Sequence, residues 1–517
     1  MNLPQGWTST TLHMVADWSS GGTPSRKKPE FFGGNIPWVK TGELTEKYIR
    51  KTEEMLTELG ISNSSAKIFP KGSVGIAMYG ATIGKVSIWG IEASTNQACA
   101  VAQPINGAIS SEFLYHFLQL EKNGLVEQGK GGAQPNISQS LLKAWPIVLP
   151  PINEQHRIVE KIEGHFAEID KAVESLKAAK ASLDHYRKSL LKAAFEGHLT
   201  ADWRARNPDK LEDPQTLLSR IRKEREANYR NALAEWEQAI ASWKESGEKG
   251  KKPAKPKPLS KFTGPNESER SGELVSPKDW LYLPLADLGQ ISGGLTKNQR
   301  RNDLPLKASY LRVANVYSNF LDLSEIKKIG ITTDELNKTR LQAGDILFVE
   351  GNGSIEQIGR VAVWDDNIAD MSHQNHLIRF RVDGSLLPSF ALHFLMSPEG
   401  RSLVIAQASS TSGLHTLSIS KVESLRVPIC SPAEQTEIVR ILDERLGAAD
   451  ALEADVNASL EYSGALRQSI LKQAFSGKLV PQDPGDEPAA ALLDRIKAQR
   501  AKKPPKPKPR KRKAAHP

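Results

Sequence analysis

The sequence predicts an α+β protein built by internal duplication, in which two globular α/β domains are each followed by a long helix. Two short phrases carry this prediction: KSLLKAAFEGHL at 188–199 and QSILKQAFSGKL at 468–479 share seven of twelve residues. The phrases INEQHRIVEKIE at 152–163 and PAEQTEIVRILD at 432–443 match at the same offset of 280 residues. The chain of 517 residues is also too long for one hydrophobic core.

The globular parts are predicted from short runs rich in β-branched and aromatic residues. SVGIAMYG and GKVSIWG in the first half correspond to DILFVEG and GRVAVWD in the second, and Gly, Asn and Pro separate the runs. Each half also contains a short helical pattern, SEFLYHFLQL at 111–120 and PSFALHFLMS at 388–397. This mixture indicates two α+β domains with many loops.

The long helices are predicted from apolar residues that recur at steps of three and four. The first series is Val159, Ile162, Phe166, Ile169, Val173, Leu176, Leu183, Leu190 and Ala194, and the second is Ile438, Leu442, Leu446, Ala449, Val456, Leu460, Ile470 and Ala474. Each helix ends at a glycine, Gly197 or Gly477, and spans about 43 residues or roughly 65 Å. Such a seam needs a partner. The other copy would give an intramolecular coiled coil; alternatively, each helix packs on its own globular domain.

An additional helix follows the first long helix and has no full counterpart in the second half. Asp213 and Pro214 suit a helix start, and the helical pattern continues to about Trp243. This segment either folds against its own domain or forms a docking helix for a partner. The predicted parts are globular domain 1 at 1–150, helix 1 at 151–200, the helical extension and Lys/Pro-rich linker at 201–262, globular domain 2 at 263–430, helix 2 at 431–480, and a short helix with a basic Pro-rich tail at 481–517.

The charge is concentrated at one end of the chain. The net charge is +9, but residues 500–513 contain nine Lys or Arg and no acid, which leaves 60 basic against 60 acidic residues elsewhere. DNA binding would therefore use local basic patches, and the Pro-rich tail is expected to be disordered. No signal peptide or apolar run of about 18 residues occurs. The two cysteines, Cys99 and Cys430, are too few for a disulfide framework. We expect a cytoplasmic protein.

The motifs of common enzymes are missing from the sequence. GATIGKV does not have the spacing of a phosphate-binding loop, and no G-x-S-x-G elbow occurs. No His and Cys cluster has zinc-ligand spacing. An Asn/Asp-Pro-Pro-aromatic motif of the kind that amino-methyltransferases use is also absent. The sequence therefore favours a binding protein without catalytic or metal-ligating residues.

Paired polar loops are the candidates for binding. STNQA at 94–98 and SHQNH at 372–376 supply amides that can pair with adenine in the major groove. SRKKP at 25–29 and KNQRRN at 297–302 follow paired SGG turns and are basic, as loops that contact phosphates should be. The candidate DNA-contacting residues are Thr23, Ser25, Arg26, Lys27, Lys28, Lys40, Tyr79, Lys85, Asn96, Gln97, Gln134, Asn136, Lys297, Asn298, Arg300, Arg301, Arg312, Asn315, Asn352, Gln357, Arg360, Gln374, Asn375 and His415.

Two variable blocks, each followed by a long helix that opens with an EQxxIV phrase and closes with a KSLLKxAFxGxL-type phrase, closely resemble the specificity subunit of type I restriction-modification systems. The resemblance implies two target-recognition domains, each reading one half of a split, asymmetric DNA site. It also implies that the two helices form an antiparallel spacer and that the chain itself is not catalytic. The 214–262 region and the basic tail depart from the common pattern.

The same resemblance implies the partners. Two methyltransferase subunits and the restriction and translocase subunits would bind the conserved segments and would carry S-adenosylmethionine, ATP and Mg²⁺. The partner-binding candidates are Glu154, Gln155, Leu191, Phe195, Glu434, Gln435, Leu471 and Phe475. Two alternatives remain at this stage: the specificity subunit of a fused restriction-methylation enzyme of the type IIB or IIG kind, and a coiled-coil scaffold that does not bind DNA. The bases read and the gap between the half-sites are not evident from the sequence.

Overall fold

The computed structural model describes residues 3–129, 136–248, 252–265, 277–411 and 414–501. The basic tail from residue 502 and the candidate Gln134 lie outside these ranges. The chain forms two compact units: unit 1 comprises 1–178 and 456–517, and unit 2 comprises 179–455. Each unit combines one globular domain with part of both long helices. The compact units therefore do not follow the linear order of the predicted segments.

Domain 1, the globular part of unit 1, is built on two mixed sheets and a short strand pair. The main sheet has the order β2-β10-β7-β8-β4, the second has β5-β3-β9-β6, and β1 pairs with β11. The strands are β1 (Thr8–Thr11), β2 (Ala16–Ser20), β3 (Phe32–Val39), β4 (Tyr48–Ile49), β5 (Glu54–Leu56), β6 (Ile68–Phe69), β7 (Val74–Ala77), β8 (Val86–Trp89), β9 (Ala93–Thr95), β10 (Cys99–Pro104) and β11 (Pro146–Leu149). The helices are α1 (Leu12–Val15), α2 (Glu58–Ser62), α3 (Ser111–Gln128) and α4 (Gln139–Ala144).

Domain 2, the globular part of unit 2, repeats this plan. Its main sheet has the order β13-β22-β18-β20, and β12 pairs with β25 as β1 pairs with β11. The strands are β12 (Leu281–Pro284), β13 (Gly289–Gly293), β14 (Lys307–Leu311), β15 (Val316–Tyr317), β16 (Phe320–Leu321), β17 (Lys327–Gly330), β18 (Ile346–Val349), β19 (Gly351–Asn352), β20 (Val361–Val363), β21 (Ser372–His373), β22 (Leu377–Val382), β23 (Ser409–Thr411), β24 (Leu414–Thr416) and β25 (Arg426–Ile429). The helices are α8 (Leu285–Leu288), α9 (Thr333–Thr339), α10 (Pro388–Met396), α11 (Pro398–Gln407) and α12 (Ile419–Ser424).

The predicted runs fall on equivalent elements of the two domains. The four strand-like phrases form β7, β8, β18 and β20, and the two helical phrases form α3 and α10. Parallel pairing is also repeated, because β3 runs parallel to β9 and β14 runs parallel to β21. The predicted α+β class and internal duplication are confirmed. These strands are short and buried along nearly their whole length, which explains why apolar runs rich in β-branched residues sufficed to predict them.

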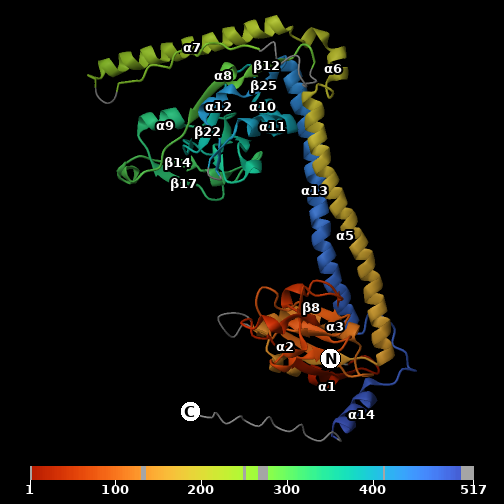
Figure 1. Cartoon of the computed structure of the whole chain (residues 1–517). Helices are drawn as coiled ribbons and strands as arrows, with labels where there is room; N and C mark the ends of the chain where they lie inside the picture. The colour runs from red at the N-terminus through yellow and green to blue at the C-terminus, as the bar shows by residue number, and fades with distance from the viewer. Residues whose placement is uncertain (1–2, 130–135, 249–251, 266–276, 412–413, 502–517) are drawn as a thin grey trace, which may run out of the picture. The chain divides into compact units, whose positions relative to one another are not determined.

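The two long helices are α5 (Ile152–Phe195) and α13 (Pro432–Phe475), each of 44 residues. In each unit their segments run side by side and antiparallel (Figure 1). In unit 2, Arg187 pairs with Asp450 at 2.7 Å and with Glu453 at 2.8 Å. In unit 1, Arg467 pairs with Asp170. The predicted intramolecular helix pair is confirmed, with ion pairs flanking its apolar seam.

Each helix packs on globular domains as well as on the other helix. The core of unit 1 contains Ile158 and Ile162 near the start of α5 together with Leu471 and Ala474 near the end of α13. The core of unit 2 contains the start of α13 and the end of α5 in the same way. Both predicted partners are thus correct in part. The apolar residues of each long helix contact the other long helix and also the globular domains.

Glycines end both helices as predicted. Gly197 has φ of +76° and Gly477 has φ of +72°, in the left-handed region that glycine adopts without strain. The amide of Gly197 donates to Ala194 O at 3.1 Å, and the amide of the next residue donates to Ala193 O at 2.9 Å. The chain then turns into α6 (Ala201–Arg206) after α5, or into the loop before α14 (Ala489–Ala501) after α13.

The additional helix is α7 (Pro214–Glu245), and Asp213 caps it by accepting from the amides of Gln215 and Thr216. Its first turns bury Leu217 and Ile221 in the core of unit 2. The Lys/Pro-rich segment returns along the helix: Trp236 Nε1 donates to Pro253 O at 3.1 Å. The segment therefore folds against its own unit, and the role of α7 in docking a partner stays a prediction.

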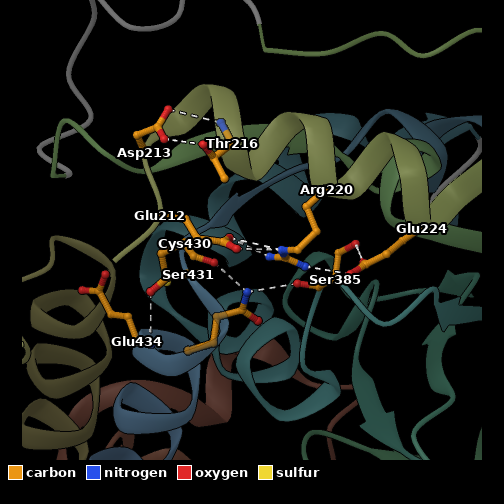
Figure 2. Close-up of polar contacts among 10 residues, drawn as sticks. Glu212, Asp213, Thr216, Arg220, Glu224, Ser385, Cys430, Ser431 and Glu434 are labelled. Carbon is orange, nitrogen blue, oxygen red and sulfur yellow. Dashed lines mark hydrogen bonds and ion pairs between the residues drawn. The ribbon is translucent and has the colours of Figure 1, made fainter. Parts of the chain in front are cut away.

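The helix α14 is the counterpart of the first turns of α7. It places Ala489, Leu493 and Ile496 in the core of unit 1. Arg495 pairs with Glu487 in unit 1, and Arg220 pairs with Glu212 in unit 2. The ion pair of unit 2 extends to Glu224 and Ser385, as Figure 2 shows. Equivalent helices thus pack on the two units. In unit 2 the helix is α7, which comes after α5, and in unit 1 it is α14, which comes after α13.

Candidate nucleic-acid interface

The paired SGG turns bring the candidate loops of each domain together. In domain 1 the amide of Gly22 donates to Thr95 O at 2.8 Å, and the side chains of Thr23 and Gln97 are hydrogen-bonded. A Cβ on Gly21 would lie 2.0 Å from Thr95 O, so the close approach of these loops requires glycine. In domain 2 a Cβ on Gly294 would lie 2.2 Å from His373 O. The turns therefore hold the two loops of each domain together.

A cation follows the parallel strand pair in each domain. Lys40 follows β3, and its Nζ lies 2.8 Å from Glu53 and 3.2 Å from Glu54. The hydrogen bond to Glu53 is the main reason that the pKa of Lys40 is raised. Arg312 follows β14 and pairs with Glu325 at 3.1 Å. Both side chains are half-buried and follow equivalent strands.

Arginine 26 joins the domain 1 group from the SRKKP loop. Its two terminal nitrogens lie 2.6 and 3.1 Å from the carboxylate oxygens of Glu54. Its guanidinium also lies 4.6 Å from the ring centre of Phe32 and 5.2 Å from that of Trp38. Glu54 is therefore shared between Arg26 and Lys40, and the pKa of this carboxyl is lowered mainly by its hydrogen bond to Arg26.

The remaining candidates lie beside these loops. In each domain the residue that follows a central strand, β7 or β18, is hydrogen-bonded to the Asn/Gln loop on one side and to a later segment on the other. In domain 1 the amide of Met78 donates to Ala98 O at 2.8 Å, and the amide of Ile137 donates to Met78 O at 2.7 Å. In domain 2 the amide of Glu350 donates to His376 O at 3.0 Å, and the amide of Leu417 donates to Glu350 O at 2.7 Å. The backbone of Tyr79 forms an antiparallel β-bridge with that of Asn136, and Asn352 of β19 lies opposite His415 of β24.

These contacts define a polar edge on each domain. It comprises residues 23–28, 40, 79–85, 96–98 and 136 in domain 1, and residues 296–302, 312, 350–360, 374–376 and 415 in domain 2. The repeated backbone contacts show that the loops paired in the sequence are equivalent in space. Side chains that carry hydrogen-bonding groups and positive charge meet at one edge, which is the arrangement that reading of base edges and phosphates requires.

Exposure divides the candidates into three groups. The exposed ones are Thr23, Ser25, Arg26, Lys27, Lys28, Tyr79, Gln97, Asn136, Lys297, Asn298, Arg300 and Gln357. The half-buried ones are Lys40, Lys85, Asn96, Arg312, Arg360, Gln374, Asn375 and His415. Arg301 and Asn315 are buried. For Asn352 only the backbone is described.

The two buried candidates are explained by contacts within domain 2. Arg301 donates to Thr296 O at 2.6 Å and Gly330 O at 3.1 Å, and it pairs with Glu335 at 2.9 Å. Asn315 accepts from the amide of Arg312 at 2.9 Å and donates to a backbone carbonyl at 2.8 Å. These positions do not suit the DNA contacts predicted for them, because all of the named groups already bond inside the domain.

The histidine of the SHQNH loop is another internal group. His373 is fully buried, and its Nδ1 lies 3.1 Å from Thr339 O. Burial, followed by the nearby charge of Arg379, lowers the pKa of His373 to about 3. The ring is therefore neutral at pH 7, and it positions the loop without adding positive charge to the polar edge.

The EQ dipeptides hold the start of each long helix on its own domain. Glu154 accepts from Trp7 Nε1 at 3.0 Å, and Glu434 accepts from Trp280 Nε1 at 3.1 Å. Gln155 Nε2 donates to two backbone carbonyls, at 2.9 and 3.1 Å. Gln435 Nε2 does the same in unit 2, at 2.9 and 3.1 Å. All four side chains are buried and hydrogen-bonded within the chain.

The closing phrases attach each long helix to a pair of phenylalanines. The Phe195 ring lies 5.3 Å from Phe390 and 5.1 Å from Phe394 in unit 2. The Phe475 ring packs at 4.8 and 5.5 Å against the equivalent pair on α3, Phe113 and Phe117, in unit 1. Leu191 and Leu471 are buried beside them. Internal packing thus accounts for all eight predicted partner-binding residues, and their contact with a partner stays an untested prediction.

Several residues of this framework were not among the candidates. Trp7 and Trp280 bind the EQ carboxylates, and Arg204 reaches Glu434 at 2.7 Å. The tryptophans could have been found from the repeated PQGW and PKDW phrases, since both occur shortly before a first strand. Nothing in the local sequence indicates Arg204, because its contact joins residues 230 positions apart.

No metal centre or membrane segment is found in the described ranges. Groups of three or more His, Cys, Asp or Glu side chains suitable for a metal ion do not occur among these residues. No described helix combines the length and apolar character that crossing a membrane requires. Cys99 and Cys430 are both buried thiols, and burial raises the pKa of Cys99 to about 12.

Comparison with known families identifies the fold. The family model described as the type I restriction modification DNA specificity domain matches residues 4–177 and 277–462. The chain belongs to this family. The EcoKI specificity subunit of Escherichia coli K12 is 26% identical over 96% of both chains, and the StySPI specificity subunit of Salmonella potsdam is 25% identical over 96% of both.

A solved structure agrees with the architecture of this specificity-domain family. A chain from a structure of a type I R-M system, described in terms of complex assembly and conformational transition, has a TM-score of 0.63 and 16% identity. It covers 92% of this chain and 100% of its own length. At this identity the likeness concerns the fold, and it confirms two α/β domains with two long helices.

Proposed function

We propose that this chain is the DNA-specificity subunit of a type I restriction-modification complex, in which each polar edge reads one half of a bipartite, asymmetric site. The observation that carries the proposal is the duplicated polar edge. The same backbone contacts gather amides and cations in both domains, while the side chains differ between them. Equivalent frameworks with different side chains suit two reading heads for two different sequences.

The chain acts by binding and positioning in this proposal. Exposed cations such as Lys27 and Arg300 contact phosphates and fix the register, and amides such as Gln97 and Gln374 approach base edges. Two methyltransferase subunits and the restriction and translocase subunits assemble on the chain and supply methyl transfer and DNA cleavage. S-adenosylmethionine, ATP and Mg²⁺ belong to these partners. The relatives are named as separate specificity subunits and match over 96% of their length, which favours this proposal over a fused enzyme.

A domain exchange tests the modular assignment. Residues 3–150 are replaced by the corresponding block of another specificity subunit, and Trp7, Phe113 and Phe117 are kept so that both long helices remain anchored. The chimera is expressed with its methyltransferase partner in a host that lacks other methylation. Methylome sequencing should show a motif that is changed in one half only. A change in both halves, or in neither, contradicts the proposal.

The spacer role is tested by lengthening both helices together. Seven residues are inserted after Ala178 and seven after Asp455, which keeps the antiparallel register and the heptad phase. The insertion adds about 10 Å at 1.5 Å per residue. Since B-DNA rises about 3.4 Å per base pair, the gap between half-sites should grow by about three base pairs. A control with only the α5 insertion should lose methylation, because the seam is then out of register.

A further inference from the structure

Domain 2 carries an exposed aromatic hairpin that the framework of the fold does not require. The hairpin, residues 316–321, consists of β15 and β16, with Val316 opposite Leu321 and Tyr317 opposite Phe320. Tyr317 is 45% exposed and Phe320 is 60% exposed. Their ring centres are 6.2 Å apart with the planes at 45°. Two large rings side by side in water indicate a contact surface.

The hairpin is braced by the rest of domain 2. Val316 and Leu321 pack in the cluster of Ala362 and Trp364. The amide of Asn319, in the turn, donates to Val361 O at 2.9 Å. The side chain of Asn315 donates to Asp322 O at 2.8 Å and so closes the base of the hairpin. The rings are therefore presented from a fixed element, which lowers the entropy cost of a contact.

The rings lie next to the polar edge. The Arg360 guanidinium is 5.4 Å from the ring centre of Tyr317. Arg312 comes four residues before β15, and the Nε atoms of Arg312 and Arg360 are buried without a hydrogen-bond partner in the described chain. The positive charge of Arg360 beside exposed rings suits a nucleic acid, because phosphates attract its guanidinium group and bases or deoxyribose rings offer flat surfaces.

Domain 1 has a different element at the equivalent place. There β4 pairs with β8, just as the aromatic hairpin packs beside β20. The Tyr48 hydroxyl donates to Glu112 at 2.9 Å, and Ile49 is only 5% exposed. Within residues 41–50 no pair of exposed aromatic rings occurs. The hairpin is thus specific to one of the two half-site readers.

We propose that Tyr317 and Phe320 form an aromatic wedge that packs against base or sugar rings of the DNA half-site bound by domain 2. The proposal rests on the proposed function of the chain. It adds a contact that depends on DNA shape, and residues 41–50, at the equivalent place in domain 1, have no pair of exposed rings with which to make it. A wedge of this kind partly unstacks a base step and thereby favours flexible steps. Domain 2 would then depend on stacking in addition to contacts with base edges.

The test compares the variant Tyr317→Ala/Phe320→Ala with the wild type in the full complex with the methyltransferase partner. The probe is a duplex that contains the motif recovered by methylome sequencing, with 2-aminopurine at single positions of the domain 2 half. Stacking is worth about 1–3 kcal/mol per base, so affinity should fall about 5- to 150-fold. In the wild type, 2-aminopurine fluorescence should change on binding at one step of that half, and in the variant this change should be lost.

Two controls separate the possible outcomes. Tyr317→Phe keeps the ring and should bind like the wild type, and Tyr462→Ala removes a 67% exposed ring on α13 and should change nothing. Wild-type affinity and fluorescence response in the double alanine variant would overturn the proposal. Loss of methyltransferase co-purification with unchanged DNA binding would also overturn it, because the rings would then contact protein. Failure of the proposed function would appear in the wild type itself, as absence of bipartite methylation.

Discussion

The two globular domains share one backbone framework and differ in the side chains that they place on it. In both domains the residue after a central strand, Met78 or Glu350, is hydrogen-bonded to equivalent segments on its two sides. In both, a tryptophan of the domain donates a hydrogen bond to a glutamate at the start of a long helix. At the polar edge, however, domain 1 shares Glu54 between Arg26 and Lys40, whereas domain 2 buries Arg301 against Glu335.

This difference teaches that anchoring and reading are separate properties of the fold. Anchoring residues are buried, satisfied within the chain and repeated at a nearly constant offset. The residues of the polar edges, for which we propose the reading role, are mostly exposed or half-buried and differ between the copies. Duplication conserved what must fit a common pair of helices and allowed the loops to vary. Four measurements can break or sharpen this comparison.

The largest expected effect concerns the phenylalanines that close the long helices. Phe195→Ala should destabilise unit 2 by about 3–5 kcal/mol, because a ring that is only 1% exposed leaves a cavity among Phe390 and Phe394. Phe475→Ala should cost less, about 2 kcal/mol, because Phe475 is half-buried. Hydrogen exchange of α10 and α3 measures the two effects separately. Equal losses would show that the two docking places are energetically the same.

The next effect distinguishes the two EQ carboxylates. Glu434→Gln should destabilise unit 2 by about 2–4 kcal/mol, since it leaves the Arg204 guanidinium, 2.7 Å away, without a counter-charge. Glu154→Gln should cost only about 1 kcal/mol, because the amide oxygen can still accept from Trp7. The bond from Gln482 is lost, but its Nε2 keeps Gly477 O as an acceptor at 2.9 Å. Burial already raises the pKa of Glu154, so a neutral group suits this site. Urea denaturation of both variants tests the difference, and a larger loss for Glu154→Gln would refute it.

A third comparison separates reading from anchoring among the basic loop residues. Lys27→Ala should weaken DNA binding uniformly and reduce the slope of log affinity against log salt by about 0.9, as expected for one phosphate contact. Arg301→Ala should mainly reduce stability, because this side chain bonds inside domain 2. Anisotropy titrations at several salt concentrations, combined with thermal melting, distinguish the two. An unchanged salt slope for Lys27→Ala would remove that residue from the interface.

The smallest effect is a pH dependence that belongs to unit 1. The His116 ring, whose Nε2 lies 3.7 Å from the carboxylate, followed by Lys47, lowers the pKa of Glu163 from 4.5 to about 2. The ionised carboxylate therefore contributes stability above pH 4.5, and this contribution disappears as the pH falls towards 2. Because the Glu163 side chain is 45% exposed, solvent screening limits the contribution to at most about 1 kcal/mol.

Glu163→Gln should therefore flatten the acid limb of the stability curve and leave stability near pH 2 almost unchanged. Chemical denaturation between pH 2 and 7 measures this effect. Asp443→Asn, which replaces the acid that faces His393 in unit 2 at 2.9 Å, is the matched variant. An identical acid limb in wild type and Glu163→Gln would contradict the assignment.

Local patterns predicted most of the elements. The strand-like phrases form β7, β8, β18 and β20, because short continuous runs of apolar and β-branched residues suffice to indicate buried strands. The heptad spacing predicted two helices that the structure shows at 44 residues each, and Gly197 and Gly477 end them. The pairing of SGG turns with Asn/Gln loops was also evident, since both features occur twice.

Burial of individual polar residues could not be predicted in the same way. Arg301 and Asn315 resemble their exposed neighbours in sequence, and only the positions of Glu335 and Asp322 show that both bond internally. The EQ and AF residues were predicted to face partners because they are repeated. The structure shows that these residues form two equivalent attachments within the chain, and their contact with a partner stays a prediction.

The sequence by itself determined the duplication, the length of the helices and the family, because these depend on spacing along the chain. Tertiary structure alone decided which residues far apart in the sequence meet. Trp7 meets Glu154 across 147 positions, and Arg204 meets Glu434 across 230 positions. Such contacts depend on how helices and sheets pack in three dimensions, and no local preference encodes them.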